Sequence, residues 1–145
     1  MKKLTIAGLV CAVQLFGHAG VVAAQDSFIL IVNATNPVST LRETEVSKLF
    51  LRKVTKWPNG KPVQPVDQVA SSPARRRFSD AIHRMDVPSV KSYWQEIVFS
   101  GRGDPPPERA SDDDIIRFVR ANPNAIGYVS SSVQLVDVKV VTLAR

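Results

Sequence analysis

The sequence predicts a single α/β domain in which a small mixed sheet is covered by helices. Residues 28–32 and 125–129 are apolar runs of the kind that form buried strands, and residues 136–143 alternate like a third strand. Segments with helical spacing separate the first two runs. The length is enough for one ordinary hydrophobic core, and we find no internal repeat or linker that indicates a second domain.

Residues 1–24 have the layout of a cleavable secretory signal peptide. Two lysines precede an apolar run over residues 4–13, and small residues at positions 22 and 24 lie before the expected cleavage point. An anchoring transmembrane helix is an alternative, but polar residues and a glycine interrupt the run. A lipoprotein site at Cys11 is another, although the apolar run before it is short. We therefore expect a secreted, periplasmic protein that does not span the membrane, with one mature domain at residues 25–145.

Composition limits the chemistry of the mature domain. Its only cysteine, Cys11, lies in the signal peptide, so disulfides, thiol chemistry and Cys-ligated metals are not expected. Loss of Lys2 and Lys3 lowers the net charge from +6 to +4. This modest basic balance favours anions, anionic lipid or acidic proteins. Because no basic stripe with interleaved aromatic residues occurs, we do not expect nucleic-acid binding.

The first third of the mature chain is expected to form a strand and a helix. The run at residues 28–32 is rich in β-branched residues, and the Asn36-Pro37 pair ends the strand in a turn. A helix begins between residues 40 and 44, where Thr40 and Glu43 have the spacing of a capping box.

The middle of the chain is expected to be mainly helical. Residues 63–66 predict a short strand that is irregular or at an edge, because two prolines flank or interrupt it. Ser72 followed by Pro73 is typical of a helix N-terminus. Asp86 begins a second helix, and apolar residues keep helical spacing for about three turns after it.

The last third is expected to form a loop, a helix and two strands. Residues 101–107 contain three prolines and two glycines, so they form a loop; the Arg-Gly-Asp tripeptide within it is interpreted as chance. Ser111 caps a helix whose first turn carries Asp112, Asp113 and Asp114, where carboxylates meet the positive end of the helix dipole. Strands at residues 125–129 and 136–143 follow.

Nothing in the mature sequence predicts an enzyme, a metal site or a cofactor. Its single histidine, His83, is expected on the polar side of a helix as a solvated residue. The acidic run at residues 112–114 lacks the further oxygen ligands and the glycine of a calcium loop. No Gly-x-Ser-x-Gly elbow or phosphate-binding glycine loop is present.

One segment is a candidate anion site. Ser71 and Ser72 precede a helix, and their hydroxyls with the free N–H groups of Ala74 and Arg75 can hold a phosphate or carboxylate. The guanidinium groups of Arg75 and Arg76 add bidentate reach. In the alternative interpretation, the arginines extend into solvent or pair with nearby acids.

The chain also resembles a known family. The segments that carry the resemblance are residues 28–50, Trp57, residues 72–78, Tyr93-Trp94, residues 99–101 and residues 125–129. They are similar to the phosphate-binding proteins of periplasmic phosphate ABC transporters, in which two lobes joined by hinge strands close over the ligand. This chain resembles the second lobe alone, with residues 28–33 and 126–129 as the strands that cross between lobes. The resemblance implies one three-layer α/β/α lobe of the type II periplasmic-binding-protein fold.

The ligand loop departs from the family pattern. Gln68 stands where the family has an arginine, and Ser72 matches the family's serine. Pro73 and Ala74 replace the Gly-Thr that follows. Proline removes a backbone N–H donor. Because glutamine replaces the family's arginine, a charge-assisted hydrogen bond to the anion is also lost. Gln68 therefore joins Ser71, Ser72, Ala74, Arg75 and Arg76 as a candidate anion-binding residue.

Two functions follow from this resemblance. The first is a phosphate-transport substrate-binding-like protein that binds phosphate or another small anion weakly, with a dimer as one way to complete the cleft. The second is a ligand-free module that kept the lobe and binds a periplasmic or membrane protein. Binding to a membrane surface or nucleic acid is a weaker third interpretation. The geometry around residues 71–77 should discriminate the first two.

Overall fold

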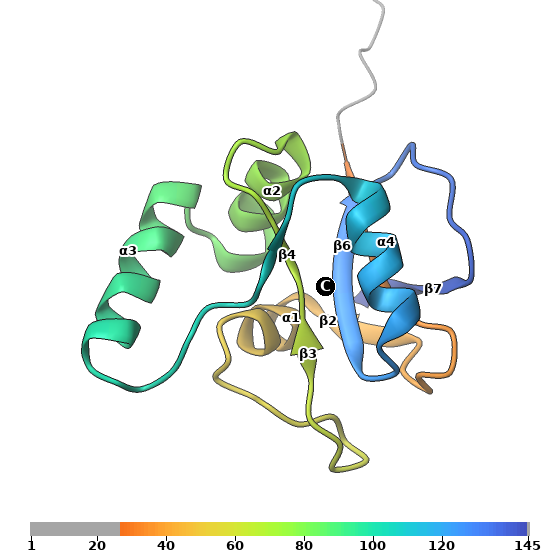
Figure 1. Cartoon of the computed structure of the whole chain (residues 1–145), viewed down its shortest axis with the longest axis horizontal. Helices are drawn as coiled ribbons and strands as arrows, with labels where there is room; N and C mark the ends of the chain where they lie inside the picture. Colours follow the sequence, from red (N-terminus) through yellow and green to blue (C-terminus); the bar gives the residue numbers. More distant parts are fainter. Residues whose placement is uncertain (1–26, 145) are drawn as a thin grey trace, which may run out of the picture.

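Two antiparallel strands form the centre of the fold in the computed structural model, which describes residues 27–144 (Figure 1). β1 (Phe28–Asn33) pairs with β6 (Ala125–Ser130), and Ile31 lies opposite Gly127. The prediction that these two apolar runs are neighbours in one sheet is confirmed. The predicted signal peptide at residues 1–24 lies outside the described residues.

The main sheet is mixed, with the strand order β2-β7-β1-β6-β3. β7 (Val138–Ala144) is antiparallel to β1, and β2 (Thr40–Arg42) is parallel to β7. β3 (Gln64–Pro65) is parallel to β6. β4 (Asp67–Gln68) and β5 (Glu108–Arg109) form a separate two-stranded sheet. Neither β2 nor β5 was expected, because such short strands carry too few residues to show a period.

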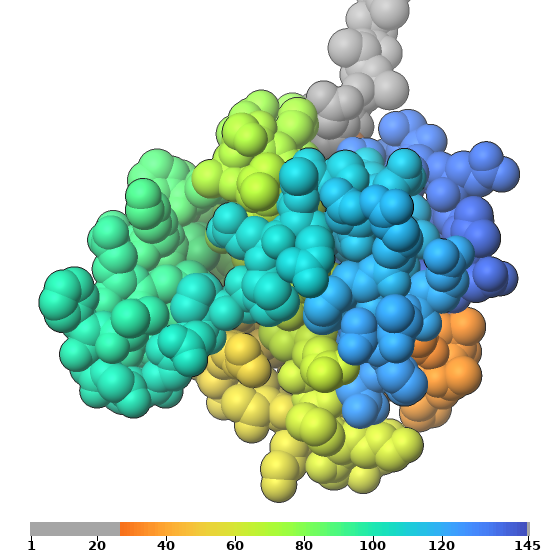
Figure 2. All heavy atoms as spheres, viewed as in Figure 1, coloured from red at the N-terminus to blue at the C-terminus, as the bar shows by residue number. Residues whose placement is uncertain are grey.

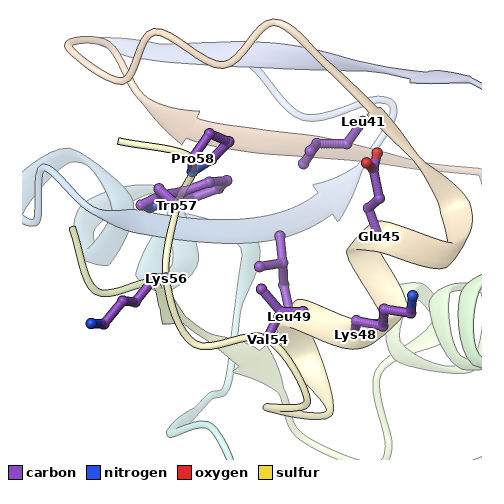
Figure 3. Close-up of a pocket in the computed structure, with 8 residues that line it drawn as sticks. All are labelled: Leu41, Glu45, Lys48, Leu49, Val54, Lys56, Trp57 and Pro58. Carbon is purple, nitrogen blue, oxygen red and sulfur yellow. The ribbon is translucent and has the colours of Figure 1, made fainter. Parts of the chain in front are cut away.

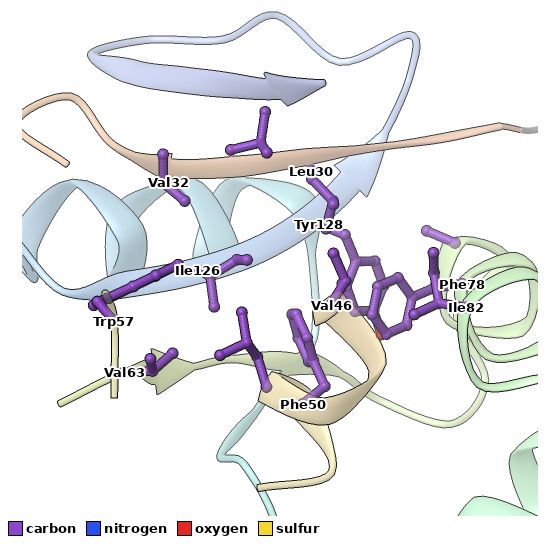
Figure 4. Close-up of a cluster of buried hydrophobic side chains, with 13 residues drawn as sticks. Leu30, Val32, Val46, Phe50, Trp57, Val63, Phe78, Ile82, Ile126 and Tyr128 are labelled. Atoms are coloured by element: carbon purple, nitrogen blue, oxygen red, sulfur yellow. The ribbon is translucent and has the colours of Figure 1, made fainter. Parts of the chain in front are cut away.

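Helices cover both faces of the sheet. The helical segments are α1 (Glu43–Phe50), α2 (Pro73–Phe78), the π-helix η1 (Ser79–His83), α3 (Val87–Phe99) and α4 (Asp112–Ala121). α1, α2 and η1 pack on one face, where Leu30 and Val32 of β1 point (Figure 4). α4 packs on the other face, against Ile31. The predicted three-layer α/β/α arrangement is therefore confirmed.

α3 lies apart from these layers. It forms its main helix contacts with η1, and the side chain of Tyr93 donates a hydrogen bond of 3.0 Å to the backbone oxygen of Leu51. In Figure 2, α3 and the loop that follows it make up the left side of the molecule, drawn in green to teal. The proline- and glycine-rich loop at residues 101–107 has no regular structure, as predicted.

Three of the predicted helix starts are confirmed at the level of atoms. The side chains of Ser72, Asp86 and Ser111 each accept a hydrogen bond from the backbone N–H three residues later. The predicted capping box of Thr40 and Glu43 is wrong. Arg42 is the N-cap of α1, and its backbone N–H donates to Glu45 at 2.7 Å. Thr40 is unavailable because it pairs with Thr142 as part of β2.

The described chain enters the domain beside the end of β6. The backbone N–H of Ser131 donates to the carbonyl of Ser27 at 2.8 Å, and the two side-chain oxygens lie 2.7 Å apart. After Ser131 the chain turns back and returns to the sheet as β7, which covers the edge of β1. Both sides of β1 are therefore paired.

Gly127 sets the distance between β6 and α4. A Cβ at this position would lie 2.8 Å from Ile115 Cγ2, 3.0 Å from Val66 Cγ1 and 3.2 Å from Val119 Cγ2. These neighbours are fully buried, so they have little room to move. The glycine is required here for close packing, since its φ is not positive.

Gly127→Ala should therefore lower the free energy of unfolding by about 1–3 kcal/mol, the usual cost of overpacking a core. Urea denaturation followed by circular dichroism measures this change. Ser132→Ala, on the exposed turn before β7, is the matched control and should change stability little. An alanine variant as stable as the wild type would contradict the packing argument.

Candidate functional site

A shallow hollow of about 350 Å³ lies where the starts of α2 and α4 meet the end of β6. We call it the serine hollow. The residues that line it are Gln68, Val69, Ser71, Ser72, Pro73, Ala110, Ser111, Asp112 and Ser130. None of these lining residues is a lysine or an arginine.

Gln68 lies buried beneath the hollow with its side-chain amide fully engaged. Its Nε2 donates to Asp112 Oδ1 at 2.8 Å and to the backbone oxygen of Tyr128 at 3.0 Å. Its Oε1 accepts a hydrogen bond of 2.5 Å from Ser72 Oγ. The glutamine therefore holds the hollow together and has no free donor for an anion.

Asp112 brings a negative charge to the wall of the hollow. Its Oδ1 accepts from Gln68 and, at 3.2 Å, from the backbone N–H of Ser130. Asp112 is also the first residue of α4, where the helix dipole stabilises a carboxylate. The chain thus places its own carboxylate where donors converge, and a bound phosphate would meet like charge.

Arg75 belongs to a buried network below the hollow. The guanidinium forms an ion pair with Asp67, and Nη1 donates to the backbone oxygen of Gln68 at 2.9 Å. Only 5% of Arg75 is exposed. Tyr128 donates its hydroxyl to the same Asp67 carboxylate, and its ring stacks on Phe78 with centroids 3.9 Å apart.

Burial controls the titration of this network. Desolvation raises the pKa of the Asp67 carboxyl, while Arg75 and the Tyr128 hydroxyl oppose that shift. Desolvation also raises the pKa of Tyr128 well above its usual value, and the nearby Asp67 carboxylate adds to the shift. The tyrosine is therefore a fixed hydrogen-bond donor at physiological pH.

The structure brings three of the six candidate anion-binding residues together. Gln68, Ser71 and Ser72 line the serine hollow. Ala74 packs in the hydrophobic core, and Arg75 is committed to Asp67. Arg76 is exposed and donates to the backbone oxygen of Ser71 at 3.3 Å.

Sequence reasoning missed three polar residues of the hollow, namely Ser111, Asp112 and Ser130. Asp112 was interpreted only as a charge that suits a helix start. That reason still holds, but the same side chain also bonds Gln68, which is 44 residues away in the chain. No local pattern predicts such a contact.

His83 does not lie on the surface, so the prediction of a solvated histidine is wrong. It is only 9% exposed, its ring packs edge-on against Phe78, and Nδ1 lies 3.0 Å from Ser47 Oγ. Its π-helical segment departs from the regular helix that the prediction assumed. Burial, reinforced by the charges of Arg75 and Lys53, lowers the pKa of His83 to about 4.

A second hollow, of about 340 Å³, lies beside α1 (Figure 3). Leu49, Val54 and Trp57 form its apolar part, and Lys48 and Lys56 lie at its edge. The Trp57 Nε1 donates to the backbone oxygen of Asn124 at 3.0 Å, so it is not free for a ligand.

The described part of the chain contains no metal-binding cluster of three or more His, Cys, Asp or Glu side chains. Within residues 27–144, no helix is both long enough and apolar enough to cross a membrane.

A family model described as a PBP superfamily domain matches residues 9–143, which is most of the sequence. The chain belongs to this family. No curated protein matches the sequence. The PBP superfamily assignment agrees with the resemblance inferred from the sequence and with the observed α/β lobe.

Solved structures of phosphate receptors share the fold of this PBP superfamily domain. One, described as a phosphate ABC transporter substrate-binding protein with bound phosphate from Clostridium perfringens, has a TM-score of 0.62 and 22% identity over 81% of this chain and 45% of its own. An ABC-type phosphate transport receptor from Vibrio cholerae has a TM-score of 0.64 and 19% identity, over 81% of this chain and 46% of its own. PstS from Borrelia burgdorferi has a TM-score of 0.63 and 13% identity, over 81% of this chain and 47% of its own. The chain therefore spans less than half the length of each receptor.

Replacement of the hollow's carboxylate by an isosteric amide should favour anion binding. Asp112→Asn keeps an acceptor for Gln68 and Ser130 but removes the like charge, so we expect at least about tenfold tighter phosphate binding than in the wild type. Isothermal titration calorimetry should detect phosphate binding by the variant at concentrations that give no heat with the wild type. Asp113→Asn, in the same helical turn but outside the hollow, is the control. Equal effects of both variants would contradict a local role for Asp112.

Stability should depend on pH through His83. Between pH 6.5 and about 4 the unfolded chain protonates this histidine while the folded chain does not, so the free energy of unfolding falls as pH falls. We expect a loss of about 1–3 kcal/mol across that window. His83→Gln should remove this part of the slope in urea titrations at several pH values. An unchanged slope would show that the histidine titrates normally.

Proposed function

We propose that this protein is an exported, non-enzymatic lobe of the phosphate-binding type that acts by binding another protein. One observation carries the proposal: the Asp112 carboxylate and the engaged Gln68 amide take up the donors of the serine hollow. Because Arg75 is committed to Asp67, it cannot supply the missing positive charge. The lobe by itself is poorly suited to hold phosphate.

The family supports a binding role. Its solved relatives are described as a phosphate ABC transporter substrate-binding protein and an ABC-type phosphate transport receptor. A lobe that spans less than half of such a receptor keeps the scaffold for protein contact even where the ligand contacts have changed. We therefore place this protein with a periplasmic or membrane component of such a system.

An exposed apolar end of α3 supports contact with a protein. Phe99 is 94% exposed, and Val98 beside it is about half exposed. They lie at the C-terminal end of the helix that stands apart from the sheet layers (Figure 1). An exposed aromatic residue next to a second apolar residue suits a partner surface better than it suits contact with water.

Export rests on the sequence of residues 1–24. The charged start, the apolar run and the small residues before Gln25 support cleavage by a signal peptidase. Cell fractionation followed by N-terminal sequencing should find the protein in the periplasm, beginning at Gln25. An uncleaved chain in the cytosol would contradict this part of the proposal.

A second candidate function is weak binding of phosphate or another small anion in a completed cleft. The exposed hydroxyl of Ser71 lines the hollow and favours this candidate. A second copy or another lobe would have to contribute the cation. Sedimentation with and without phosphate tests it, because anion-dependent association is expected only if the cleft is shared.

The main proposal predicts two results with the purified protein. Calorimetry should show no binding of phosphate at about 1 mM, the concentration at which even a binding free energy of about −4 kcal/mol would be detected. Affinity purification from periplasmic extract should retain a partner that Phe99→Ser loses.

Val140→Ser is the matched control, since Val140 is an exposed apolar residue on β7. Both serine variants should remain as stable as the wild type, because exposed substitutions usually change stability by less than about 0.5 kcal/mol. Tight phosphate binding by the wild type would contradict the proposal. So would the same set of retained proteins for all three forms.

A further inference from the structure

A cavity of about 500 Å³ lies between α3 and the body of the domain. Pro88 and Trp94 of α3 form one apolar wall, and Pro105 and Pro106 of the following loop form another. Figures 1 and 2 show this loop passing from the end of α3 toward β5, beside β4. The volume falls within the range of sites that hold small molecules.

The base of the cavity is polar and buried. Arg75 and Asp67 both line it, and their ion pair lies against the apolar walls. Arg75 Nη1 is engaged by Asp67 and by the backbone oxygen of Gln68. The Arg75 Nε–H is buried but has no acceptor among the described residues. Such a donor is destabilising unless an acceptor reaches it.

The charges around the cavity indicate the ligand's chemistry. Glu108 Oε1 lies 3.8 Å from Arg75 Nη1, and Asp67 is already neutralised by Arg75. Lys91 lies on the lining of the cavity and forms no ion pair with another described residue. Arg75 can balance only one of these two carboxylates, so the lining as a whole carries about as much negative as positive charge. Lys91 is its exposed donor without a described acidic partner, and it favours a ligand that brings an oxygen acceptor.

We propose that this cavity is a second ligand site, separate from the serine hollow, for a small molecule with a flat apolar body and one carboxylate or carbonyl oxygen. The body packs between Trp94 and the prolines of the loop, since flat rings and prolines offer matching apolar surfaces. The oxygen is directed toward Lys91, the exposed donor on the lining. The two sites share no lining residue.

The experiment uses naphthalene-2-carboxylate and naphthalene-2-carboxamide as probes. They share one flat body and differ in charge. The protein is labelled with nitrogen-15, purified in the form that cells accumulate, and titrated with each probe. The chain has two tryptophans, so the indole N–H region of the NMR spectrum carries its own control. Trp94 lines the cavity, whereas Trp57 lies beside α1 and bonds Asn124.

We expect a saturable shift of the Trp94 indole signal with a Kd of about 1 mM or tighter, which is the strength that probes of this size reach in a fitting cavity. The Trp57 signal should not move. Ala70→Leu, which fills the cavity from an exposed position, should weaken both probes at least about tenfold.

A second variant decides the charge of the acceptor. Lys91→Ala should weaken the carboxylate about fivefold or more and leave the carboxamide unchanged if the natural ligand is an acid. Unchanged binding of the carboxylate by this variant assigns the neutral carbonyl class instead. Lys61→Ala, on an exposed turn, is the matched control. The proposal is overturned if neither probe gives a saturable Trp94 shift up to about 10 mM, or if Ala70→Leu binds as well as the wild type.

Discussion

The ion pair between Asp67 and Arg75 joins β4 to α2 in the interior of the domain, and much of the site depends on it. Removal of either partner would leave an uncompensated buried charge, which typically costs about 3–5 kcal/mol. Tyr128 extends the pair to β6 through its hydroxyl, and the Phe78 ring fixes the tyrosine by stacking. The arginine that the sequence offered as an anion ligand is therefore a structural cation. Because Arg75 is held by Asp67, it lines the cavity beside α3 and does not line the serine hollow.

The serine hollow combines hydroxyl groups with the starts of two helices, which is a polar surface of the kind that can bind an anion. Its amide donors are, however, already bonded to the chain's own Asp112 carboxylate, and the Ser72 hydroxyl is bonded to Gln68. An internal carboxylate has a high effective concentration because it is already positioned, so a free anion competes poorly with it. The bond from Ser130 to Asp112 also ties α4 to β6, so the same carboxylate stabilises the lobe.

Local patterns predicted the elements well, because each depends on near neighbours in the chain. The apolar runs of β1 and β6 and the caps Ser72, Asp86 and Ser111 are examples. The site was less predictable, because its geometry depends on distant contacts. Arg75 faces Asp67 rather than an anion, and Gln68 bonds Asp112 across 44 residues. His83 was placed on the wrong side of its helix because one π-helical turn rotates the residues that follow. The single-lobe fold was predicted from the resemblance to phosphate-binding proteins, because hydrophobic periodicity alone does not identify it.

The joining of Ser27 to Ser131 has a consequence for how this lobe can be combined with other domains. The chain's entry and the turn after β6 emerge side by side, next to Ser130 of the serine hollow. A polypeptide fused before Ser27 or inserted into residues 131–137 would be joined to the lobe at the same place, close to that surface. In the chain as it is, residues 131–137 lead directly into β7, which pairs with the free edge of β1. The side of the lobe that carries the serine hollow is therefore the side to which a fused or inserted segment would be joined.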